Sequence, residues 1–241
     1  MKIRLPALLA AAVVVSALGC ASQAQAQTFY GPGGLFVHPS AFSPKPGSRS
    51  MAASIITQDS DHGSGQYVPV SLSFGLTERF SAGALLISHR GDAHPHDHGG
   101  VFAKYQLAPD GANRPAFAVA GAYRRQDSME TSLAGVASHQ FLGRSGRPLV
   151  VGHLGVKYGR HPSGRDDVGA YGGVEVPLGG DVRLVGELST RLRFEESAAR
   201  GLGLFWGKPG TVSVGLGMVN LGRGRRDGFF FGVGYPLGGG S

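Results

Sequence analysis

The stretch that decides the fold is Val182-Arg183-Leu184-Val185-Gly186-Glu187-Leu188-Ser189-Thr190-Arg191. Successive side chains of a β-strand point to opposite faces, so Leu184 and Leu188 would share one face and Arg183 and Glu187 the other. The stretch therefore predicts a strand with an apolar side and a polar side.

The same alternation recurs along the chain, and clusters of turn-forming residues separate one stretch from the next. After Gln27 no segment repeats apolar residues with helical spacing for three turns. We predict about twelve strands, within a range of ten to twelve. They cover Ser50–Thr57, Tyr67–Gly75, Phe80–His89, Val101–Leu107, Ala116–Arg124, Ser132–Phe141, Leu149–Tyr158, Val168–Leu178, Val182–Arg191, Leu202–Gly207, Thr211–Asn220 and Phe229–Leu237.

The connections favour a membrane barrel over a soluble sandwich. Every second connection is short, as at residues 77–79 and 179–181, and those between are mostly longer and more charged, as at residues 59–65 and 90–99. Short turns on one rim and long polar loops on the other are typical of outer-membrane barrels. We predict an all-β fold, an antiparallel transmembrane β-barrel, whose even strand number leaves both termini in the periplasm.

The N-terminus has the pattern of an export signal. Lys2 and Arg4 precede an apolar run, and Ala24-Gln25-Ala26 offers a cleavage site, so residues 1–26 are expected to be a cleaved signal peptide. Cys20 follows small residues, as in a lipid-attachment site, and the alternative is that it is discarded with the signal. Residues 27–48 would be a periplasmic segment leading into the barrel, and residues 49–241 the barrel domain.

Composition excludes two other classes of protein. The 23 Lys and Arg exceed the 16 Asp and Glu, for a net charge of +7, but without the clustered basic stripe that nucleic-acid binding requires. The 41 glycines could indicate disorder, yet 41% of the residues are hydrophobic, which favours curved β-structure.

The chain also resembles a known family near its N-terminus. The run Gly31-Pro32-Gly33-Gly34-Leu35-Phe36-Val37-His38-Pro39-Ser40-Ala41 is similar to the opening motif of YjbH-like outer-membrane proteins. Residues 74–80, 103–107 and 114–119 look like the first barrel repeats of that family. The resemblance spans residues 31–121 and implies an outer-membrane barrel associated with exopolysaccharide production.

Polar residues on the expected inner face are the candidate site. Basic groups outnumber acidic ones there, which would favour anions in an open pore. The alternative is that these groups pair with one another and fill a narrow lumen. The lumen-facing candidates are Lys104, Gln106, His153, Lys157, Glu175, Arg183, Glu187 and Arg191.

Two other kinds of chemistry have weaker signals. His94, His96 and His98 would project to one side of an extended chain, which suits zinc, copper or nickel, but the alternative is a solvated outer loop. A lipid-modifying enzyme would need a Ser-His pair, and the adjacent Ser138 and His139 would point to opposite faces of a strand. We expect no cofactor and no catalytic residues.

The leading hypothesis is a non-enzymatic outer-membrane barrel with a structural or transport-accessory role and a link to exopolysaccharide export. Its expected partners are outer-membrane lipid, the barrel-assembly machinery and polysaccharide, with no nucleic acid. The alternatives are a small anion-favouring pore and a lipid-modifying barrel enzyme.

Overall fold

The computed structural model describes residues 34–60, 63–90, 96–125, 129–143, 147–160, 163–192, 197–207, 211–221 and 226–238. The predicted signal peptide and Cys20 lie outside these ranges. Among the described residues, no helix is long and apolar enough to cross a membrane.

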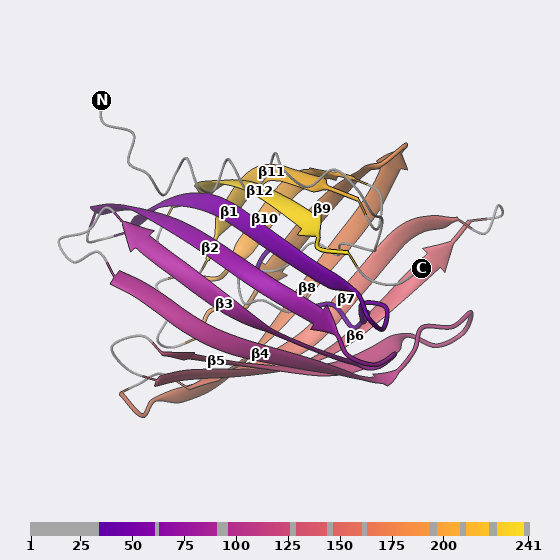
Figure 1. Ribbon diagram of the computed structural model, residues 1–241, viewed down its shortest axis with the longest axis horizontal. Coiled ribbons are helices and arrows are strands. Elements are labelled where there is room, and N and C mark those ends of the chain that lie inside the picture. The colour runs from indigo at the N-terminus through magenta and orange to yellow at the C-terminus, as the bar shows by residue number, and fades with distance from the viewer. Residues whose placement is uncertain are drawn as a thin grey trace.

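The fold is a closed barrel of twelve antiparallel strands, as the sequence predicted (Figure 1). Each strand pairs with its neighbours in sequence, and β1 pairs with β12 to close the sheet. The strands are β1 (Arg49–Ser60), β2 (Gly63–Gly75), β3 (Phe80–Arg90), β4 (His96–Ala108), β5 (Ala116–Arg125), β6 (Met129–Leu142), β7 (Pro148–Arg160), β8 (Asp166–Gly179), β9 (Val182–Ser189), β10 (Arg200–Trp206), β11 (Ser213–Asn220) and β12 (Gly228–Pro236).

The two rims differ less than the sequence predicted. We call the rim where β1 begins the turn rim and the opposite one the loop rim. Residues 59–65 and 90–99 were expected to be long loops at the loop rim, but pairing continues there, with Asp59 opposite Ser64 and Ser88 opposite Asp97. The loop prediction was wrong at both places because backbone pairing does not need apolar side chains and runs on past the apolar part of the strands.

The short turns were predicted more accurately. The turn between β8 and β9 includes Gly179 and Gly180 at φ of 105° and 58°, a left-handed backbone that glycine adopts without steric cost. Such tight turns match the twist of antiparallel strands.

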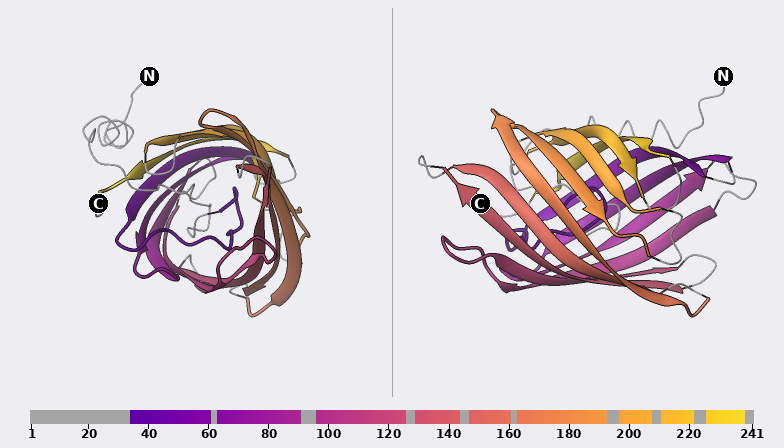
Figure 2. Two further views of the ribbon diagram at one scale, coloured as in Figure 1. Left: turned by 90° about the vertical axis from the view of Figure 1, so that its right-hand side faces the viewer. Right: turned by 180° about the vertical axis from the view of Figure 1, so that it is seen from behind.

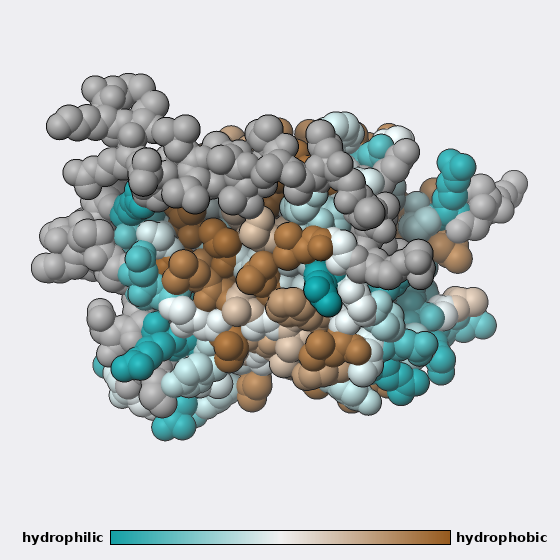
Figure 3. All heavy atoms as spheres, viewed as in Figure 1, coloured by the Kyte–Doolittle hydropathy of each residue, from teal (hydrophilic) through white to brown (hydrophobic). Residues whose placement is uncertain are grey.

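The outer face carries an apolar band. Figure 3 shows apolar surface gathered over the middle of the barrel, with polar residues toward both ends. In β7, Leu154 is 69% exposed while its neighbours His153 and Gly155 are buried. Exposed aromatic side chains near the turn rim are Phe74, Tyr105, Phe117, Phe141 and Trp206, and near the loop rim Tyr123 and Phe229. An apolar band between two aromatic girdles is the surface that a lipid bilayer requires of a β-barrel.

The inside of the barrel is packed rather than empty. Figure 2 shows the N-terminal part of the described chain crossing the interior of the ring of strands. Leu35, Phe36 and Val37 are buried there with inward side chains of the wall such as Val185 and Phe205. Residues 34–42, which we call the lumen segment, therefore lie within the barrel and share its core.

Candidate functional site: the occupied lumen

The lumen segment enters the barrel as a tight reversal of the chain. The Leu35 amide donates to the His38 carbonyl at 3.0 Å, and Gly34 and Pro39 form an antiparallel bridge. A Cβ on Gly34 would lie 2.4 Å from the Ser40 nitrogen, so glycine is needed for the two arms to approach this closely. The reversal presents Leu35, Phe36 and Val37 at its tip.

Glycines on the inner wall make room for that tip. A Cβ on Gly201 would lie 2.6 Å from Phe36, and one on Gly173 would lie 2.4 Å from Leu35. The Phe36 ring lies with its centroid 5.2 Å from those of both Phe205 and Phe230. The glycines leave space on the inner wall, and the aromatic rings pack around Phe36, so the wall forms an apolar pocket that fits the tip of the segment.

The side chain of Glu187 binds the backbone of the same tip. Its carboxylate accepts the Val37 amide at 2.9 Å and the His38 amide at 3.4 Å. Nδ1 of His38 lies 3.4 Å from Oε1 of the same carboxylate, and its ring stacks on Tyr171 with centroids 4.4 Å apart. Because a carboxylate makes stronger hydrogen bonds than a neutral acceptor, Glu187 is a strong anchor.

Three wall side chains bind four consecutive carbonyl oxygens of the segment. The Tyr171 hydroxyl donates to Pro39 O at 3.1 Å. The Lys104 ammonium donates to Ser40 O at 3.3 Å and also to Phe42 O. The Gln106 amide donates to Ala41 O at 3.0 Å. We call Lys104, Gln106 and Tyr171 the donor row.

A second polar series runs along the wall beside the donor row. The Ala41 amide donates to Oγ of Ser138 at 2.8 Å, and Oγ lies 2.8 Å from Nδ1 of His153. Nε2 of His153 is 3.2 Å from Glu175, whose other oxygen is 3.3 Å from Arg183. The residue types are those of a hydrolase triad, but Ser138 is 1% exposed and its oxygen already binds the lumen segment. In this conformation the series anchors the segment.

His139, the other half of the Ser138-His139 pair, points away from that series. Its Nδ1 lies 2.8 Å from Oδ1 of Asp110, in the connection between β4 and β5. The structure therefore places the two adjacent residues on opposite faces of β6.

The predicted lumen residues divide into those that touch the segment and those that do not. Lys104, Gln106 and Glu187 bind it through hydrogen bonds, and the His153 ring meets the Phe42 ring edge-on with centroids 6.0 Å apart. Glu175 and Arg183 belong to the adjoining series. Lys157 is buried on the same face and donates to Ser189 at 3.2 Å.

The prediction that Arg191 faces the lumen from a strand was wrong. This residue was expected on the inner face of a strand reaching residue 191, but β9 ends at Ser189 and Arg191 is exposed beyond it. Conversely, Arg124 is buried on the inner face of β5, where the alternation Ala116, Ala118, Ala120, Ala122, Arg124 could have revealed it.

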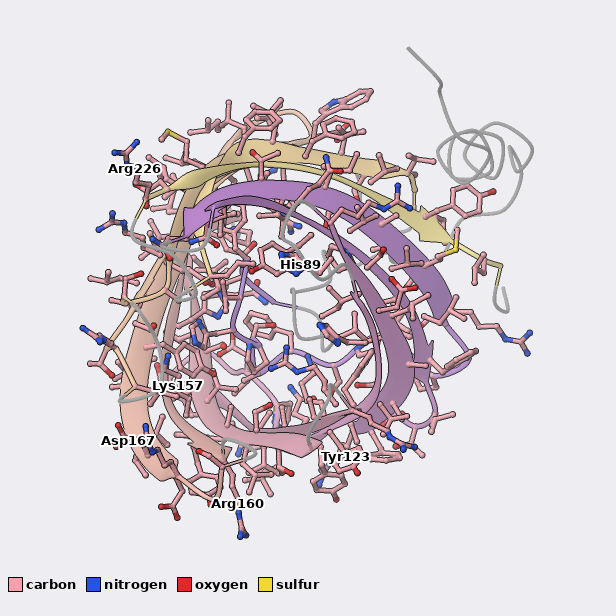
Figure 4. The ribbon with its side chains drawn as sticks, turned by 90° about the vertical axis from the view of Figure 1, so that its left-hand side faces the viewer. His89, Tyr123, Lys157, Arg160, Asp167 and Arg226 are labelled. Atoms are coloured by element: carbon pink, nitrogen blue, oxygen red, sulfur yellow. The ribbon has the colours of Figure 1, made fainter. Side chains whose placement is uncertain are left out.

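Two of the three histidine candidates for a metal, His96 and His98, lie in β4 near the loop rim. His94 is outside the described residues, the side chain of His96 is not described, and His98 is buried in β4. The register sets His96 opposite His89 of β3, which lies inside the ring of strands (Figure 4) and stacks on Tyr67 at 4.5 Å. Within the part of the chain that the structure describes, no three His, Cys, Asp or Glu residues are grouped to hold a metal ion.

No protein-family model matches this chain, and no curated protein matches it either. Among solved structures, the KdgM porin is similar with a TM-score of 0.57 at 13% identity, over 77% of this chain and 98% of the porin. The KdgM porin in complex with disordered oligogalacturonate gives a TM-score of 0.60 at 10% identity, over 77% and 98% of the two chains. Omp33 of Acinetobacter baumannii gives 0.50 at 6% identity, over 80% and 100%.

These similarities show an outer-membrane-type barrel fold, as the sequence predicted. At such low identities they concern the fold alone. They give no support to the resemblance to YjbH-like proteins.

Proposed function

We propose that this protein is an outer-membrane channel whose resting state is closed by residues 34–42. The observation that carries the proposal is the lumen segment itself, which is bound by its backbone to the wall of a porin-like barrel. Its Ala41 amide and the carbonyls of residues 39–42 are all held by polar side chains of that wall. A segment held in this way can leave without breaking any strand pairing.

The closed state is strongly favoured in this account. Burial of Leu35, Phe36 and Val37 contributes roughly 1.5–3 kcal/mol each. The channel would therefore open rarely unless something competes with the segment.

An open lumen would favour anions. Among the described residues, its buried or half-buried basic groups are Lys104, Arg124, Lys157 and Arg183, against the acidic Glu175 and Glu187. An excess of positive charge in a low-dielectric passage raises the local concentration of anions. This retains the anion-favouring pore predicted from the sequence, with Arg124 in place of Arg191.

The second candidate is a purely structural barrel. The observation that favours it is the continuous apolar core formed by the lumen segment and wall residues such as Ile56, Ile87 and Phe102. A link to exopolysaccharide export rests on the sequence resemblance alone and remains part of the proposal. Export across the inner membrane rests on the signal-peptide pattern of residues 1–26, and insertion in the outer membrane rests on the apolar outer band and the porin-like fold.

The test is the conductance of the full chain in planar bilayers, with wild type compared with Phe36→Ala. Removing a buried Phe side chain costs about 3–5 kcal/mol, which would raise the population of the open state about a hundredfold or more. We expect rare openings of the wild type, frequent openings of the variant, and a reversal potential in a KCl gradient that indicates anion preference. A Phe36→Ala barrel that folds but carries no current would contradict the channel function and favour the structural role.

A further inference from the structure

We propose that the lumen wall around the donor row is a binding site for a carboxylate-bearing sugar chain, and that the lumen segment occupies this site in the closed barrel. The inference rests on the proposed channel function and assigns its ligand class. It also supplies a competitor that would make opening more frequent.

The donor row recognises oxygens along an extended chain rather than particular side chains. Lys104 and Gln106 stand two residues apart on the inner face of β4, and Tyr171 reaches in from β8. They bind the backbone carbonyl oxygens of residues 39–42. Another extended chain with oxygen acceptors along its length can take the same donors.

Charge favours a carboxylate at Lys104. This side chain is 1% exposed, and two carbonyl oxygens of the segment accept its protons. The carbonyls offer this ammonium only dipoles, whereas a carboxylate adds the Coulomb attraction between two opposite full charges. A ligand carboxylate would therefore bind Lys104 better than the carbonyls that it displaces.

The remaining groups suit a sugar ring. The His38 ring lies nearly parallel to Tyr171, at 17°, so departure of the segment uncovers one face of Tyr171. A flat aromatic face can pack against the C–H face of a pyranose. Glu187 and Ser138, which accept amide protons from Val37 and Ala41, can accept sugar hydroxyls instead.

These features together select among anions. A small inorganic anion would use Lys104 but leave Tyr171 and Gln106 unfilled, and a neutral sugar would leave Lys104 without a carboxylate. A uronate-type oligosaccharide supplies acceptors, hydroxyl donors, a flat ring and negative charge at once.

The test uses trigalacturonate as the probe and neutral maltotriose as its control. Binding to the refolded full chain in detergent is measured by calorimetric titration, and block of the current is measured in planar bilayers. We expect trigalacturonate to bind Phe36→Ala more tightly than wild type, because the segment competes in the wild type. Maltotriose should bind at least about tenfold more weakly than trigalacturonate.

Lys104→Met and Lys157→Met, each in the Phe36→Ala background, form the matched pair. Both remove one inward positive charge, but Lys104 donates to two carbonyls of the segment, whereas Lys157 donates to Ser189 of the wall. We expect Lys104→Met to weaken trigalacturonate binding by about tenfold or more and Lys157→Met to weaken it much less.

The inference fails if trigalacturonate does not bind Phe36→Ala, if wild type and Phe36→Ala bind it equally, or if the two lysine variants lose binding to the same extent. In those cases a conducting Phe36→Ala barrel would leave the channel function standing. A silent but folded barrel that still binds trigalacturonate would support the site and contradict the channel.

Discussion

Gly201→Ala is expected to release the lumen segment while leaving the barrel wall intact. The three atoms nearest to a Cβ at this position all belong to Phe36, namely Cδ2 at 2.6 Å, Cγ at 2.9 Å and Cβ at 3.3 Å. The ring cannot simply swing aside, because the rings of Phe205 and Phe230 pack against it. The added methyl group therefore acts on the segment rather than on a neighbouring strand.

The size of the effect follows from overpacking. Inserting a methyl group into a packed core costs about 1–3 kcal/mol, which shifts the docking equilibrium of the segment by roughly 5-fold to 150-fold. The assay is the open probability in planar bilayers, with heat modifiability on a denaturing gel to report an intact barrel.

Gly186→Ala on the adjacent strand is the matched control. Its Cβ would meet Leu202 at 3.7 Å and Val174 at 3.8 Å, which are ordinary contacts. We expect this variant to behave like the wild type. A wild-type open probability in Gly201→Ala, or an equal change in both variants, would show that contact with Phe36 does not hold the segment in place.

Three further predictions concern the lipid face, the anchor and the loop rim. Leu154 lies in the middle of the exposed face of β7, so Leu154→Arg should lower the free energy of unfolding, measured by refolding in lipid, by about 2–4 kcal/mol. Leu142→Arg at the turn rim should cost only about 0–1 kcal/mol. Equal costs would contradict the membrane placement. Glu187→Gln keeps one carbonyl oxygen for two segment amides and loses the charge, so the open probability in bilayers should rise about tenfold. Asn220→Ala removes the oxygen that accepts a hydrogen bond from the Gln58 amide at 2.9 Å, and both residues are buried. The free energy of unfolding in urea titrations should fall by about 1–3 kcal/mol. An unchanged urea midpoint would show that water replaces the bond.

The strands could be predicted because their signal is local. In β9, Leu184 and Leu188 alternate with Val185 and Glu187, which indicates that the two faces of the strand have different surroundings. Of these four residues, the structure buries only Val185 and Glu187. The ends of strands at the loop rim could not be predicted in this way. The pairing of Asp59 with Ser64 depends on the neighbouring strand and leaves no apolar period in the sequence.

The place of the lumen segment was beyond local reasoning. Residues 34–42 carry no alternation, and their position depends on complementarity to strands more than 100 residues away, as in the contact between Phe36 and Gly201. One signal was available: glycines occupy inward positions 173, 201 and 203, where a narrow barrel would otherwise be filled by its own side chains.

Whether residues 34–42 fill the lumen can be measured by the labelling rate of a cysteine in that segment by a charged thiol reagent. In a Cys20→Ser background, Val37→Cys would probe a position that is 1% exposed, and Pro46→Cys an exposed position at the turn rim. We predict that the refolded barrel in liposomes labels rapidly at position 46 and is protected at position 37 until it is unfolded. Equal labelling rates at the two positions in the folded barrel would show that the segment does not fill the lumen.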